Sequence, residues 1–359
     1  MDSIRSQELS SRLHIRKSLQ EIVAEITAPG KLMIQLNGWR NVCQTLDYIY
    51  THWCDLFDNI SGISFAYDGL CQVVGNICSA ENLKKKVLIG EMFKITISSY
   101  KLDNERTSEL LEGFDDLDRN LKKFSIWGCH FVILQVKLDP FRPFGARQVP
   151  FDNSEYFGIF SATAQSLGMV PIIQFKIELA EYREEKSISA LMDIMNTITA
   201  TFFDFDVDIS CLIISPLLSF SLKDIAIKKN AIANAEILIN ALQQGLPPAI
   251  GGVIFASDGS YKTYSLLIDQ LSKIINRIPW PIVCSYEWKV PHVLESDTRN
   301  EVLEKWTNKQ RVIMKVFSLA SEGKLITWKG KLTSDIPDYI VTHDYYDPKY
   351  VEAMLEPPT

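Results

Sequence analysis

The stretch LPPAIGGVIFASDG, residues 246–259, decides the fold prediction because it runs from a helix end through a strand into a loop. The segment before it, residues 223–244, places apolar side chains on one helical face, namely Ile232, Ala235, Ile239 and Leu242. Gly245 and the prolines at positions 247 and 248 end that helix. Residues 250–256 form a near-continuous apolar run, which predicts a strand buried on both faces.

Apolar runs of this kind recur along the chain, and helix-periodic segments separate them. The eight predicted strands are residues 32–36, 62–67, 87–97, 130–138, 169–179, 209–215, 250–256 and 281–286. Strands that alternate with helices favour a parallel sheet over an antiparallel sandwich. Eight such units in a chain of 359 residues predict an α/β protein with a closed (β/α)8 TIM barrel.

The chain is predicted to be one domain, since no low-complexity or Pro/Gly-rich linker divides it. Residues 301–322 form the last barrel helix, which Gly323 ends. Residues 1–346 then comprise an N-terminal helix, the barrel and a C-terminal strap across it, which covers residues 329–346. Residues 347–359 are a separate extension, in which three prolines block regular structure.

Composition excludes several classes of function. A net charge of −7 makes nucleic acid and anionic membranes poor partners, because both need a basic surface. No apolar run reaches the roughly 18 residues of a membrane span, and the first residues lack the apolar region of a signal peptide. Seven cysteines, an odd number without paired spacing, favour reduced thiols and a cytoplasmic location.

Metal and cofactor sites are not expected. The five histidines lack the spacing of a zinc site, and Gly-rich phosphate loops are absent. Asp204, Asp206 and Asp208 alternate, yet the glycine and glutamate of a calcium loop are missing, so a solvated connection is expected there.

Several motifs, in the same order along the chain, resemble class I fructose-bisphosphate aldolases. Residues 246–259 are similar to that family's Val-Pro-Pro-Ala-Val-x-Gly-Ile-x-Phe-Leu-Ser-Gly-Gly. ITAPGK at 26–31 resembles Ile-Val-Ala-Pro-Gly-Lys, and GMVPII at 168–173 resembles Gly-Ile-Val-Pro-Ile-Val. CSY at 284–286 and LASEGK at 319–324 continue the series with the family's spacing.

The resemblance covers roughly residues 12–346 and implies a glycolytic aldolase barrel, whose reaction needs a lysine on strand six to form a Schiff base. The family's Leu-Leu-Lys-Pro reads Ile-Ile-Ser-Pro here, with Ser215 at the lysine position. A serine hydroxyl cannot form an imine. On strand five the family's Glu-Pro-Glu becomes Gln174, Phe175 and Lys176, and neither Gln174 nor Lys176 replaces a carboxylate as proton shuttle.

Other positions that the resemblance marks as catalytic have also changed. On strand four the family's Lys-Trp-Arg reads Ile133, Leu134 and Gln135, which removes two cations. At the end of strand one, Asn37 replaces an aspartate and lacks the charge that tunes neighbouring lysines. Lys94 is the one active-site lysine that clearly remains, and a solvated or paired lysine is the simpler interpretation. No catalytic residue of the aldolase reaction is therefore expected.

The phosphate site that the resemblance implies is vestigial. Ser257 is kept, but Asp258 replaces a glycine whose backbone approaches the phosphate. Trp288 stands where the family has an arginine that holds phosphate with two hydrogen bonds. Trp39 and Trp288 are expected to plug the vacated mouth, and the alternative is that tryptophans, including Trp328, anchor a partner protein.

The sequence therefore predicts a pseudoenzyme that acts as a structural or protein-binding module in the cytoplasm. The resemblance extends this prediction to cytoskeletal filaments as partners and to a homotetramer. The alternative is an active enzyme, either a glycolytic fructose-bisphosphate aldolase or one with other carbonyl or sugar-phosphate chemistry around Lys94, Lys137, Lys176 and Asp258. Lys137 is the candidate for a relocated amine, and loss of the arginine argues against a sugar-phosphate sensor.

Overall fold

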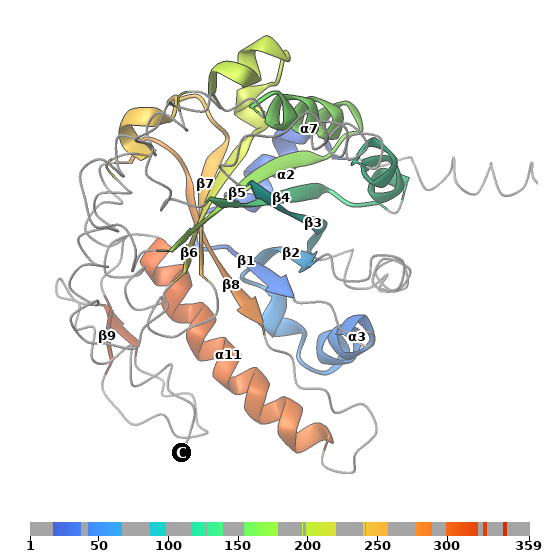
Figure 1. Ribbon diagram of the computed structural model, residues 1–359. Helices are drawn as coiled ribbons and strands as arrows, with labels where there is room; N and C mark the ends of the chain where they lie inside the picture. The colour runs from blue at the N-terminus through green and yellow to red at the C-terminus, as the bar shows by residue number, and fades with distance from the viewer. Residues whose placement is uncertain are drawn as a thin grey trace, which may run out of the picture.

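Eight parallel strands close into a barrel in the computed structural model, in the order β1 to β8 (Figure 1). The structure describes residues 17–36, 42–66, 87–97, 117–126, 128–138, 154–178, 199–219, 242–257, 278–288, 299–321, 326–328 and 340–342, with the single positions 196 and 240. Within these residues, every barrel strand pairs in parallel with both neighbours, and β1 pairs with β8. The predicted (β/α)8 barrel is confirmed.

The strands lie close to their predicted positions. They are β1 (Leu32–Leu36), β2 (Ile60–Ala66), β3 (Leu88–Ile97), β4 (Phe131–Leu138), β5 (Val170–Glu178), β6 (Ile213–Ser219), β7 (Gly252–Ser257) and β8 (Ile282–Trp288). Strand six differs most, because its first predicted residues form the short 3-10 helix η3 (Ile209–Cys211). The Asp208 carboxylate accepts a hydrogen bond from the Ser210 backbone N–H and caps this turn. Ser215 therefore lies inside the strand and not at its end.

A short helix closes the amino-terminal end of the barrel. Helix α2 (Leu19–Ile26) begins at Ser18, whose hydroxyl and backbone N–H form a reciprocal capping box with Glu21. The helix contacts both β2 and β5, which lie on opposite sides of the barrel, and so crosses its end. Ile22, Val23 and Ile26 are buried there in the barrel core.

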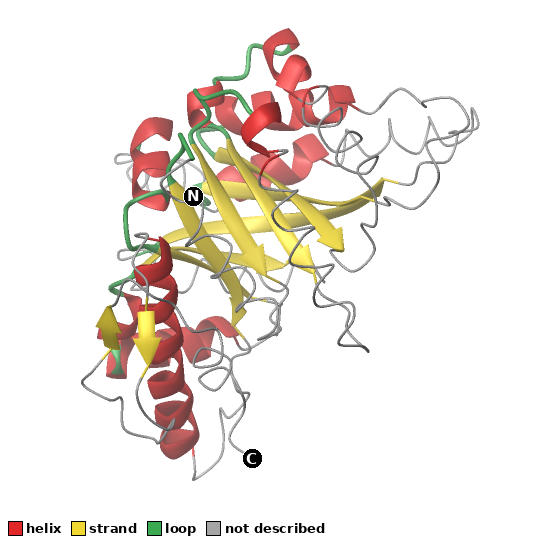
Figure 2. Cartoon of the chain, turned by 90° about the vertical axis from the view of Figure 1, so that its left-hand side faces the viewer, coloured by secondary structure: helices red, strands yellow, loops and turns green. Residues whose placement is uncertain are grey.

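Helices surround the sheet, as Figure 2 shows. The named helices outside the barrel are α3 (Val42–His52), η2 (Cys54–Phe57), α7 (Ser154–Ser166) and α11 (Arg299–Ser321). Residues 117–126 and 199–204 are also helical. α11 confirms the predicted last helix, whereas the helix predicted at 223–244 lies mostly outside the described residues. Its described end continues through Gly245, since the Leu246 N–H still donates to the Leu242 carbonyl at 2.9 Å.

The barrel interior is apolar in the half nearer the amino ends of the strands. Phe131 lies in the core cluster near the axis, surrounded by Met33, Leu88, Ile172, Ile213, Ile254 and Val283. A Cβ atom at Gly90 would lie 2.2 Å from the Phe131 ring and 2.6 Å from its backbone oxygen. Only glycine therefore allows β3 and β4 to approach as they do.

The C-terminal segment adds a small sheet outside the barrel. Strands β9 (Ile326–Trp328) and β10 (Ile340–Thr342) pair antiparallel, and β9 contacts α11 (Figure 1). Of the strap predicted at 329–346, residues 340–342 are described. The extension at 347–359 lies outside the described residues.

Candidate functional site

Four of the positions singled out in the sequence meet on neighbouring strands. Lys94 on β3, Gln135 on β4, Gln174 on β5 and Ser215 on β6 are successive Cα partners. They lie beyond the apolar half of the barrel, towards the carboxyl ends of the strands. Barrel enzymes place their active sites at this end.

Three of these side chains form a chain of hydrogen bonds. The Gln135 Nε2 donates to Gln174 Oε1 at 2.6 Å, and the Gln174 Nε2 donates to Ser215 Oγ at 3.1 Å. Gln174 is 1% exposed and Ser215 is fully buried. The position of the family's lysine is thus an uncharged hydroxyl that accepts a hydrogen bond from a neutral amide.

Apolar and hydroxyl side chains surround this chain of hydrogen bonds. Ile133 belongs to the apolar core cluster with Met92 and Ile172, where the resemblance implied a cation. Ser64 on β2 and Ser285 on β8 are buried, and their hydroxyls have no hydrogen-bond partner within the described part of the chain. Gln35 on β1 is also buried and pairs with Ser64 in register. The described centre of the barrel is therefore polar but uncharged.

Sequence reasoning missed Gln35 and Ser64, and it used Ser285 only as part of a motif. A signal was present, because each is a polar residue within a mostly apolar strand. Polar residues inside such strands are expected to have hydrogen-bond partners or a function.

The remaining lysines lie near the carboxyl ends of three consecutive strands. Lys94 is on β3, and Lys137 on β4 is the Cα partner of Lys176 on β5. Their backbones are described, whereas their side chains lie outside the description. Asn37 and Asp258 are also outside the described residues, and of Ser257 the backbone pairing with Tyr286 is described.

Trp288 requires a correction, because it does not line the barrel mouth. Its side chain is 2% exposed, and its ring packs edge-on against Trp306 of α11 at 5.1 Å between centroids. Its Nε1 donates to the Tyr286 hydroxyl at 2.8 Å, and that hydroxyl donates to Gln310 of α11. Trp288 therefore joins the sheet to α11. It is not part of a phosphate site, does not plug the mouth and is not exposed to anchor a partner. The sequence pattern misled because the predicted strand ended at residue 286, whereas β8 continues to Trp288.

The comparisons with known proteins agree with this geometry. The family model described as fructose-bisphosphate aldolase class-I matches residues 45–345. The chain belongs to the class I fructose-bisphosphate aldolase family. This confirms the resemblance that the motifs indicated.

Relatives within the aldolase family are distant. A fructose-bisphosphate aldolase of Dictyostelium discoideum is 20% identical over 239 residues, which are 61% of this chain and 66% of that protein. The chloroplastic fructose-bisphosphate aldolase 1 of Chlamydomonas reinhardtii is 23% identical over 258 residues, 70% of this chain and 64% of that protein. The matched segments thus span just under two thirds of these relatives.

A solved aldolase shares the fold. Fructose-bisphosphate aldolase from Plasmodium falciparum, in complex with TRAP and a small-molecule inhibitor, superposes with a TM-score of 0.58 at 15% identity. The match covers 87% of this chain and 95% of that one. At this identity the likeness establishes the barrel alone.

One buried carboxyl group lies away from the aldolase site. Glu91 of β3 is 1% exposed, and no described residue hydrogen-bonds to its Oε2. Desolvation raises its pKa well above the usual value, which the Met92 backbone N–H offsets in part. Glu91 is adjacent to the inward-facing Gly90, so it lies on the outer face of the sheet and cannot serve the barrel mouth.

The described cysteines are mostly inert. Cys129, Cys211 and Cys284 are buried, and Cys54 is exposed. Burial raises the pKa of Cys211 to about 11 and that of Cys284 to about 12, which disfavours the reactive thiolate. Within the described ranges, no group of three His, Cys, Asp or Glu side chains could hold a metal ion. No helix in these ranges is long and apolar enough to cross a membrane.

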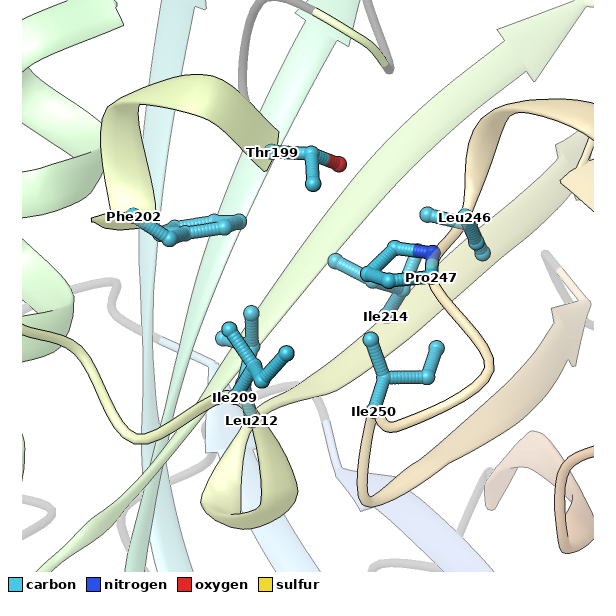
Figure 3. Close-up of a pocket in the computed structure, with 8 residues that line it drawn as sticks. All are labelled: Thr199, Phe202, Ile209, Leu212, Ile214, Leu246, Pro247 and Ile250. Atoms are coloured by element: carbon cyan, nitrogen blue, oxygen red, sulfur yellow. The ribbon is translucent and has the colours of Figure 1, made fainter. Parts of the chain in front are cut away.

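A small pocket lies beside the amino ends of β6 and β7, away from the carboxyl ends of the strands (Figure 3). Its walls are mostly apolar and include Phe202, Ile209, Ile214 and Ile250. Thr199 is its one polar side chain, so this pocket offers no group for acid–base or nucleophilic chemistry.

Proposed function

We propose that this member of the aldolase family is a catalytically inactive pseudoenzyme that acts as a structural or protein-binding module. The observation that carries the proposal is the hydrogen bond from Gln174 to the buried Ser215 hydroxyl. The Ser215 hydroxyl occupies the position at which the family needs an amine.

The chemistry of this pair supports inactivity. An amine condenses with a ketone to an imine, whose cationic form withdraws electrons from the bond that breaks. A hydroxyl can add to the ketone only as a hemiketal, which withdraws no electrons in this way. Gln174 cannot take or give a proton near neutral pH, so the adjacent position offers no general acid or base.

Retention of the barrel supports a role in protein binding. The glycine and apolar positions that build the strands persist, as the close approach at Gly90 illustrates, while the described side chains at the barrel centre are uncharged. The Plasmodium falciparum aldolase was solved in complex with TRAP, so a barrel of this fold can be part of a complex. By resemblance to the family, we propose a cytoplasmic homo-oligomer with cytoskeletal filaments as the class of partner.

Borohydride trapping tests the proposed inactivity. The full chain is incubated with fructose 1,6-bisphosphate or dihydroxyacetone phosphate and reduced with borohydride. Its mass is then measured by intact-protein mass spectrometry. An active class I aldolase treated in parallel is the positive control, because its imine must be trapped. The expected result is no added mass, and a stable adduct on any lysine of this chain would defeat the proposal.

Cosedimentation tests the proposed partners. Full-length protein is centrifuged with actin filaments and separately with microtubules, and size-exclusion chromatography with light scattering gives the oligomeric state. Enrichment in one filament pellet is expected. Protein that remains in the supernatant with both filaments would refute the cytoskeletal part.

The lysine positions favour one second candidate, an enzyme with different carbonyl chemistry. Lys94, Lys137 and Lys176 follow one another on β3, β4 and β5, and the last two are Cα partners. A lysine beside another cation has a lowered pKa and is a better nucleophile. Peptide mapping of a borohydride adduct to Lys137 or Lys176 would favour this candidate, whereas cleavage of fructose 1,6-bisphosphate would favour an ordinary aldolase.

A further inference from the structure

Three buried serines share one layer of the barrel interior. In a (β/α)8 barrel, four side chains from alternate strands form a layer, and the level rises by about one residue per strand. The Cα partner of Ser64 is Gly90 on β3, and the Cα partner of Gly90 is Phe131 on β4. Ile133 lies two residues beyond Phe131 and is therefore at the level of Ser64. Across β5, the same step leads from Ile133 to Ser215 on β6. Across β7 it leads on to Ser285, and across β1 it returns to Ser64.

The hydroxyls of this serine layer (Ser64, Ser215 and Ser285, with Ile133) are incompletely satisfied. Ser64 and Ser215 are fully buried, and Ser285 is 1% exposed. Ser215 accepts from Gln174, whereas Ser64 Oγ and Ser285 Oγ have no hydrogen-bond partner among the residues that the structure describes. Native proteins rarely leave such groups unpaired, and ordered water is the usual partner where no protein group is in reach.

The serine layer is also small for its place in the barrel. Bulky branched residues usually fill such layers, but here Ile133 is the only one. The next layer towards the carboxyl ends of the strands contains Gln35, Met92, Gln174 and Ala256. Two amide side chains and the short side chain of an alanine therefore cover the serine layer. A polar cavity that offers two to four partners holds water, whereas a purely apolar one stays dry.

We propose that the serine layer binds at least one ordered water molecule on the barrel axis. The water bridges the hydroxyls of Ser64 and Ser285 and reaches that of Ser215, which gives it the roughly three hydrogen bonds typical of buried water. It lies at the level of the strand-six serine. The proposal goes beyond the absence of catalysis, since a protein without this water could still be inactive and bind partners.

The competing arrangement is a dry one, in which the two hydroxyls rotate towards backbone carbonyls of their own strands. The two arrangements predict different results when the hydroxyls are removed. Removing a hydroxyl that binds water loses the water and its hydrogen bonds. Removing a hydroxyl in a dry interior leaves the number of bound waters unchanged.

Magnetic relaxation dispersion of the water nuclei ¹⁷O and ²H tests the proposal, because it counts waters that stay inside the protein longer than bulk exchange allows. The variants are Ser64→Ala, Ser285→Ala and the double variant of the full chain. Ser61→Ala is the matched control, since Ser61 of β2 is similarly buried but its hydroxyl already hydrogen-bonds to the Ile26 and Leu32 carbonyls, at 3.2 and 3.1 Å, and needs no water.

The expected result is that the double variant loses at least one long-lived water relative to the wild type and has a lower Tm. The Ser61→Ala control keeps the wild-type water count. An unchanged water count in the double variant overturns the proposal, whatever its Tm. A high-resolution crystal structure gives a second test, in which a solvent peak within hydrogen-bond distance of Ser64 Oγ and Ser285 Oγ supports the water and an empty, dry layer refutes it.

Discussion

Replacing the strand-six serine by the family's residue, Ser215→Lys, probes the barrel centre most directly. The side chain at this position is fully buried and faces the neutral amide of Gln174. Burial without a paired carboxylate lowers the pKa of a lysine from about 10.4 by up to about 3–5 units. The amine introduced here should therefore be largely neutral and nucleophilic between pH 8 and 9.

The same burial makes stability depend on pH with a defined sign. The folded pKa is lower than the unfolded one, so below pH ~10.4 the unfolded state binds more protons and stability rises with pH. The slope is about 1.36 kcal/mol per pH unit, so between pH 7 and pH 9 the variant should gain roughly 2.7 kcal/mol if the folded pKa lies below 7. At pH 7 the total loss is about 4–5 kcal/mol, a large share of the ~5–15 kcal/mol that stabilises a folded domain.

Ser215→Met is the matched control, since it has similar length and no charge. Urea unfolding of both variants from pH 7 to pH 10 measures their difference in stability, which should shrink as the pH rises. Borohydride trapping with dihydroxyacetone phosphate at pH 8.5 should label Ser215→Lys only. The Ser215→Lys variant should still not cleave fructose 1,6-bisphosphate, because Gln174 cannot transfer protons. A pH-independent difference between the variants would show that the position is solvated and would refute the reasoning.

Three further substitutions test the fold. Gly90→Ala should destabilise the protein by at least about 1–3 kcal/mol in thermal unfolding, because the new methyl group would lie 2.6 Å from the Phe131 backbone oxygen; Gly62→Ala, whose nearest neighbours are side-chain atoms at 3.0 Å or more, should cost less, and equal losses would contradict this account. Glu91→Gln should remove a pH dependence: the raised pKa makes Glu91 stabilising at low pH, and its contribution is lost as pH rises from the unfolded pKa of about 4.5 towards the folded one. Urea titrations of Glu91→Gln and wild type at pH 4 and pH 8 check this, and parallel pH profiles would speak against a neutral Glu91. Ser18→Ala should cost about 1 kcal/mol in urea unfolding, since the capping box of α2 is lost, and an unchanged midpoint would show that the cap is not needed.

Local patterns predicted the strands well and their ends less well. The run Ile209–Ser215 looked like a strand from its apolar residues alone, yet Asp208 caps a turn at its start and shifts the strand to Ile213–Ser219. The predicted strand 281–286 leaves Trp288 beyond its end as a plug of the barrel mouth, whereas Trp288 continues β8 and packs against Trp306. In both cases the apolar pattern indicated burial correctly. The partner in the burial came from elsewhere in the chain.

The amino-acid sequence by itself determined the eight-stranded barrel, because each strand is a local apolar run, and the absence of an amine before Pro216, because residue identity needs no coordinates. Only the tertiary structure decided which polar side chains meet. Gln135, Gln174 and Ser215 are separated by 39 and 41 residues along the chain, and strand register brings them into contact. Ser64 and Ser285 come from opposite ends of the sequence and share a layer only because β1 and β8 close the barrel.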